Sequence, residues 1–153
     1  MSCKRPIGFW VLMILGAFTL LMLLVGQMMS FINYEFTVSI GLQESVGVVG
    51  EMGVAVNKGF GVGDTIIYIP LLVIGLVGLW IRKKWGIYAM IGALGITAYW
   101  PMVTIFLLLF ARGTPGFNFT NFTSYSVLLT AFTLYGLWGL WYIYKKREVL
   151  VKE

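Results

Sequence analysis

Four long apolar stretches, separated by short polar segments, dominate the pattern along this chain. A hydrocarbon core about 30 Å thick needs roughly 20 apolar residues in a helix. Segments that cross it are helical, because no water is present there to satisfy the backbone polar groups. The pattern therefore predicts an all-α polytopic membrane protein, a four-transmembrane-helix bundle with spans at 7–29, 65–81, 85–110 and 125–144.

More polar segments connect these spans. The expected connections are two outer loops, a turn and a tail, at 30–64, 111–124, 82–84 and 145–153. In the first outer loop, apolar residues recur about every 3.6 positions, which predicts a short amphipathic helix that lies on the outer surface or dips back into the bundle. The glycine-rich stretch 59–63 predicts a flexible entry into the second span. We expect residues 1–153 to form a single integral membrane domain.

The second and fourth predicted spans end in a similar motif. Residues 75–80 (GLVGLW) and 136–141 (GLWGLW) differ at one position, and a basic cluster follows each of them. Two interpretations stay open. The chain contains two tandem helix-pair repeats, related by an axis along the membrane normal, or apolar segments flanked by lysine match by chance.

Composition and charge support the membrane assignment and give it a direction. The chain is 59% hydrophobic and 11% charged, whereas soluble domains are about 45–50% apolar and about 25% charged. All lysines and arginines except Lys58 and Arg112 lie in the turn or near the two chain ends. The positive-inside rule therefore predicts a multi-pass protein of the cell membrane with cytoplasmic N- and C-termini. Membrane lipids, and no nucleic acid, are the expected partners.

Two absences narrow the chemistry. The sequence contains no histidine, which excludes imidazole metal ligands and the commonest general base. Cys3 is the single cysteine, so neither an intrachain disulfide nor a Cys-x-x-Cys pair can form. We therefore expect no metal site and no cofactor, and we assign no residue a catalytic role in the leading hypothesis.

Polar side chains of the spans concentrate toward their outer halves. If they face inward, they line a polar pocket that opens outward between the helices; the alternative is hydrogen bonding between helices, worth about 0.6 kcal/mol per pair. Asp64 is interpreted either as a helix N-cap or as the ion-pair partner of Arg112. The candidate ligand-binding residues are Asp64, Tyr68, Thr97, Trp100, Thr104, Arg112, Ser126 and Thr130.

Three functions are consistent with these features. The leading hypothesis is a non-enzymatic protein that binds or transports a small amphipathic or lipid-like ligand in the outward-opening pocket. The second is a structural or assembly subunit, in a homo-oligomer or a larger membrane complex, that uses its glycine-rich helix faces. The third is a lipid-modifying membrane enzyme in which Asp64 or Glu51 acts as the acid or base.

Overall fold

The computed structural model describes residues 5–151, and no strand occurs among them. Within this part of the chain, four helices are long and apolar enough to cross a membrane. They run over Ile7–Ile32, Val46–Trp80, Lys84–Phe110 and Phe122–Leu150. The predicted all-α, four-helix membrane bundle is thereby confirmed.

Two of the four membrane helices contain a π-helical segment. The first helix joins three segments: α1 (Ile7–Met22), the π-helical η1 (Leu23–Met28) and α2 (Met29–Ile32). The second likewise joins α4 (Val46–Gly63), the π-helical η2 (Asp64–Tyr68) and α5 (Ile69–Trp80). The remaining elements are a short helix, α3 (Tyr34–Ser39), and the two long helices α6 (Lys84–Phe110) and α7 (Phe122–Leu150).

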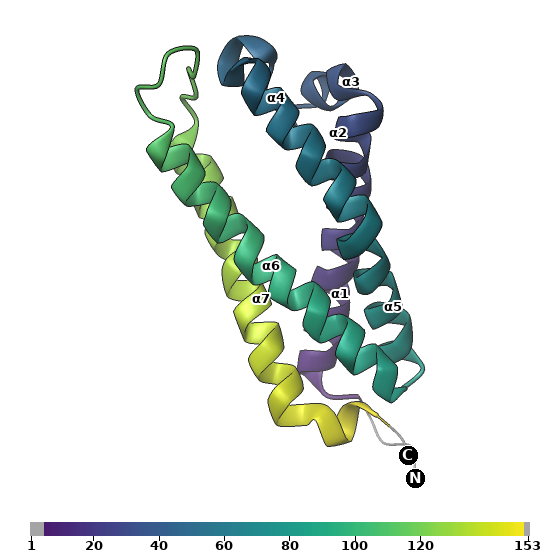
Figure 1. The fold of residues 1–153 in the computed structure, drawn as a ribbon. Coiled ribbons are helices and arrows are strands. Elements are labelled where there is room, and N and C mark those ends of the chain that lie inside the picture. Colours follow the sequence, from purple (N-terminus) through teal and green to yellow (C-terminus); the bar gives the residue numbers. More distant parts are fainter. Residues whose placement is uncertain (1–4, 152–153) are drawn as a thin grey trace.

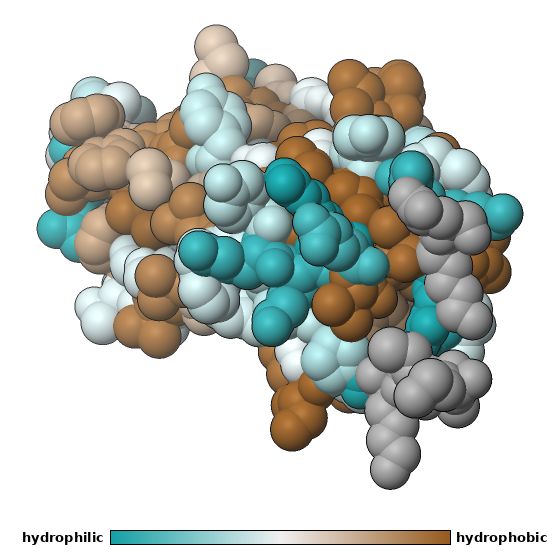
Figure 2. Space-filling view, turned by 90° about the horizontal axis from the view of Figure 1, so that it is seen from below, coloured by the Kyte–Doolittle hydropathy of each residue, from teal (hydrophilic) through white to brown (hydrophobic). Residues whose placement is uncertain are grey.

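The bundle has two distinct ends (Figure 1). The start of α1, the end of α7 and the turn between α5 and α6 lie at one end, which we call the terminal end. Helix α3 and the connection between α6 and α7 lie at the opposite end, the loop end. Hydrophilic side chains gather in the middle of the face seen from the terminal end, with hydrophobic side chains around them (Figure 2).

The second membrane helix begins earlier than the sequence predicted. The expected span was 65–81, with a flexible stretch at 59–63, whereas the structure is helical over Val46–Trp80, with a kink at Gly50 (φ 70°, ψ 172°). The flexible entry is wrong, because Gly61 lies inside the helix and a Cβ at this position would collide with the main-chain oxygen of Gln27. Glycine here allows two helices to approach rather than loosening one. The amphipathic helix expected in the first outer loop corresponds to α4 and is continuous with the membrane helix.

Helix α6 packs closely against both α5 and α7. Gly78 of α5 meets Gly86 of α6 backbone against backbone. In α7, a Cβ on Gly136 would lie 2.6 Å from the main-chain nitrogen of Ala98. Such close approach increases the van der Waals packing that drives helix association in lipid.

The motif shared by 75–80 and 136–141 lies in two different settings. In both copies the glycines contact α6. The copy in α5 therefore packs on the helix that follows it in the chain, and the copy in α7 on the helix that precedes it. Taken over all their segments, the first and second membrane helices contact each other about as extensively as α6 and α7 do. The internal repeat therefore stays a prediction.

Hydrogen bonds connect the segments at the loop end. The Oη atom of Tyr34 donates to the main-chain oxygen of Glu44 (2.9 Å) and accepts from Nδ2 of Asn57 (3.0 Å). Burial raises the pKa of Tyr34, and the hydrogen bond from Asn57 acts in the opposite direction. The main-chain nitrogen of Asn118 donates to the oxygen of Val48 at 2.7 Å, which ties the α6–α7 connection to the first turn of α4.

The contact between α6 and α7 can be tested at Gly136. A Gly136→Val substitution is expected to lower stability by about 1–3 kcal/mol, because the added side chain overpacks against α6. The measurement is the unfolding temperature of the detergent-purified protein. Gly95→Val is the matched control, since no heavy atom lies within 4 Å of a Cβ at Gly95. Equal destabilisation by both variants would contradict the role of the contact.

Candidate functional site

Tyr68 and Thr97, two of the predicted site residues, are joined by a hydrogen bond. Tyr68 Oη lies 2.5 Å from Thr97 Oγ1, and both side chains are buried. Because the Thr97 hydroxyl donates to the main-chain oxygen of Ala93 (2.8 Å), the Tyr68 hydroxyl is the donor within the pair. The pair links η2 to α6 in the interior of the bundle, so both hydroxyl protons are already engaged within the protein.

Trp100 and Thr104 also lie on α6. The Trp100 ring contacts Phe60 of α4 edge to face, with 6.1 Å between the ring centroids. Its indole Nε1 is buried and has no hydrogen-bond partner among the described residues. The Thr104 hydroxyl donates to the main-chain oxygen of Trp100 at 3.0 Å. Trp100 therefore brings α6 into contact with α4 and keeps an unused donor.

Asp64 lies in the interior of a helix rather than at its start. The capping interpretation is wrong because α4 precedes Asp64 without a break, so its neighbouring amides belong to a continuous helix. No ion pair or hydrogen bond joins Asp64 to Arg112 within residues 5–151. The Asp64 side chain is 6% exposed, and its Oδ2 atom is buried without a partner among these residues.

The residue that faces this region from the first helix is Gln27, which was absent from the predicted site. Gln27 lies in η1, and η1 packs against η2. Its Oε1 atom is buried and, among the described residues, has no hydrogen-bond partner. In the sequence, Gln27 is a single amide side chain near the end of an apolar run. Such a residue is as typical of the polar end of a membrane helix as of a binding site. The two π-helical segments, which contain Gln27 and Asp64 and pack against each other, have no sequence signature of this kind.

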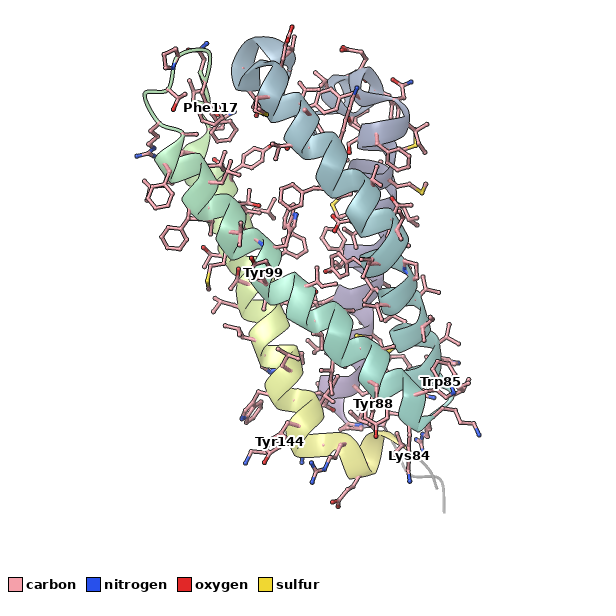
Figure 3. The ribbon with its side chains drawn as sticks, in the orientation of Figure 1. Lys84, Trp85, Tyr88, Tyr99, Phe117 and Tyr144 are labelled. Carbon is pink, nitrogen blue, oxygen red and sulfur yellow. The ribbon has the colours of Figure 1, made fainter. Side chains whose placement is uncertain are left out.

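A shallow hollow runs along α7 near the loop end. Two predicted residues, Ser126 and Thr130, lie on it; the complete lining is Phe122, Thr123, Ser126, Val127, Thr130, Ala131 and Leu134. At its loop-end limit, the guanidinium carbon of Arg112 lies 3.8 Å from the centroid of the Phe122 ring. Arg112 belongs to the same connection as Phe117 (Figure 3). The Ser126 hydroxyl is buried and lacks a partner within the described chain.

The structure does not bring the eight predicted residues together in one pocket. Ser126 and Thr130 line the hollow on α7, and Arg112 lies beside it at Phe122. Tyr68 and Thr97 form a closed pair, whereas Trp100 contacts α4 and Thr104 is bonded within α6. Asp64 lies buried in η2. The hollow follows a single helix and is not the expected pocket between helices. Threonines of the spans mostly donate to the carbonyl four residues earlier, which satisfies their hydroxyls locally.

Metal-ligand clusters and similarity to known proteins give no further evidence about the function of this site. Residues 5–151 contain no group of three or more His, Cys, Asp or Glu side chains that could hold a metal ion. No protein-family model, curated protein or solved structure matches the chain.

The Tyr68–Thr97 pair yields a measurable expectation. Tyr68→Phe should lower the free energy of unfolding by about 0.6 kcal/mol, the average for a hydrogen bond between membrane helices. Tyr99→Phe removes a hydroxyl from a side chain that is 70% exposed and serves as the control. Unfolding in detergent, followed by circular dichroism, compares the two. A larger effect of Tyr99→Phe would show that the buried pair does not stabilise the bundle.

Proposed function

We propose that this protein binds a small amphipathic, lipid-like ligand along α7, with the polar group of the ligand at Arg112. The observation that carries this proposal is the arrangement of the hollow on α7, because a cation lies at one limit of an elongated, mostly apolar lining. An acyl chain fits a stripe of this kind, and a guanidinium suits an anionic head group.

The lining has the composition that an amphipathic ligand needs. Phe122, Val127 and Leu134 offer apolar contact along successive turns of α7. Thr130 is exposed and adds a hydroxyl to this lining, whereas the Ser126 hydroxyl is buried and has no partner among the described residues. A few polar groups within an apolar lining give orientation and specificity, while the apolar contact gives most of the affinity.

Arg112 is suited to the head group by its position. Its guanidinium stacks on the Phe122 ring, which restrains the side chain and leaves the donors at the edge of the guanidinium plane for a ligand. Arginine binds carboxylate and phosphate groups through two parallel hydrogen bonds. Fatty acids and anionic phospholipids carry such groups, and both match this end of the hollow.

We also infer that the loop end faces outward in the cell membrane and the terminal end faces the cytoplasm. The Arg82–Lys84 turn, residues 145–147 and Arg5 place most of the basic side chains at the terminal end, as the positive-inside rule requires. Trp85, Tyr88 and Tyr144 also lie toward this end (Figure 3), and aromatic side chains favour the membrane interface. The α7 hollow then opens in the outer leaflet.

The orientation can be checked by thiol labelling of intact cells. Wild-type protein, whose single thiol is Cys3, should remain unlabelled by a membrane-impermeant reagent until the cells are permeabilised. A Cys3→Ser, Thr114→Cys variant should be labelled at once, because Thr114 is exposed in the α6–α7 connection. The reverse pattern would overturn the proposed orientation.

Ligand binding is tested by removing the cation. Arg112→Gln is expected to weaken binding of a fluorescent fatty-acid analogue by tenfold or more, since a hydrogen bond to a charged group contributes about 1.5–3 kcal/mol. Binding is measured by titration of the detergent-purified protein. Lys58→Gln removes the other loop-end cation and is the matched control. Equal affinities of the two variants would refute the site at Arg112.

A further inference from the structure

The strongest unexplained feature of the interior is the contact between the two π-helical segments. η1 and η2 each interrupt a membrane helix, and they pack against each other. π-Helical turns are rare, and those inside α-helices occur frequently at functional sites. Neither segment belongs to the α7 hollow.

The contact is close because of a glycine. A Cβ on Gly61 would collide with the main-chain oxygen of Gln27 and with the Ser30 hydroxyl, so the backbones of the two helices meet directly at this point. Asp64 follows Gly61 by three residues and therefore lies on the same side of its helix. This spacing turns Asp64 toward η1, where Gln27 is located.

The two side chains at this contact present oxygen atoms without donors. Asp64 Oδ2 and Gln27 Oε1 are both buried, and neither has a hydrogen-bond partner among the described residues. An unpaired charge or polar atom at membrane depth is unfavourable. Two unpaired acceptors on helical segments that pack against each other, one of them a carboxylate, are a suitable environment for a small cation, which would satisfy both.

Other charged groups contribute little around Asp64. The titratable side chain that interacts with it is Tyr68, in the same π-helical segment, and its hydroxyl is engaged with Thr97. η1 contains no titratable residue. Lys58, the nearest basic residue along α4, is exposed. Among these side chains, none neutralises the Asp64 carboxylate, so a bound cation would be needed to do so.

We propose that Asp64 and Gln27 form a binding site for a small monovalent cation, a proton or a sodium ion, at the contact between η1 and η2. The carboxylate of Asp64 supplies the charge, and the amide oxygen of Gln27 supplies the second ligand atom. For a proton, the protonated carboxyl donates a hydrogen bond to the amide oxygen. For sodium, both oxygens coordinate the ion. This proposal is independent of the ligand proposed at α7.

The test uses the unfolding temperature of the full chain in detergent. Sodium chloride is compared with choline chloride at equal ionic strength, and mildly acidic with mildly alkaline pH. The variants are Asp64→Asn and Gln27→Leu, and the control is Glu51→Gln, which neutralises an exposed acid on α4. Because a cation that binds only the folded state stabilises it, the wild type and the control should respond to that cation.

The outcomes separate the two cations. If sodium is bound, replacing choline by sodium raises the unfolding temperature of the wild type and the control, and this shift is lost in Asp64→Asn and reduced in Gln27→Leu. If a proton is bound, sodium has no effect, and acidification produces the shift that Asp64→Asn lacks. Parallel responses of all four proteins to both changes would overturn the proposal. Should Asp64→Asn fail to fold, a full response in Gln27→Leu would overturn it.

Discussion

The absence of water in the hydrocarbon core is the constraint on which the rest of this structure depends. It requires helices, because only helices satisfy their own backbone groups within one segment. It also explains why Thr97 and Thr104 donate to carbonyls of their own helix and why Tyr68 donates to Thr97. Because most polar groups in the bundle are paired in this way, a buried polar atom without a partner indicates a candidate binding site. The described residues place such atoms on all four membrane helices: Gln27, Asp64 and Trp100 on the first three, and Ser126 and Tyr142 on α7.

Glycine determines how the four helices approach each other. Lipid tails are as apolar as leucine, so moving a leucine side chain from lipid into a helix contact gives little free energy of association. Close backbone contact between the helices has to provide that free energy instead. Gly78 and Gly136 provide that contact with α6, and Gly61 provides it between the two helices that carry π-helical segments. The same residue type that suggested flexibility in the sequence therefore fixes the positions of Gln27 and Asp64.

Helix number and approximate position followed from the sequence because they depend on length and hydrophobicity alone. The start of the second membrane helix did not, since 59–63 has a loop-like composition but is helical in the structure, where Gly61 packs against η1. The sequence also could not predict which of the site residues lie close to one another. Helices such as α6 and α7 are apolar on nearly all sides, so hydrophobic periodicity does not reveal which face turns inward. Arg112 and Ser126 were identified by chemistry, but their position at the hollow on α7 depends on that rotation.

The kink at Gly50 has a further consequence for the shape of the second membrane helix. At 1.5 Å per residue, residues 51–80 span about 45 Å, and the bilayer measures about 40–45 Å with its head groups. The turn before the kink is tied to the α6–α7 connection through the main-chain hydrogen bond from Asn118 to Val48. Because the chain changes direction at Gly50, this first turn lies beside the neighbouring loop instead of lengthening the straight part of the helix.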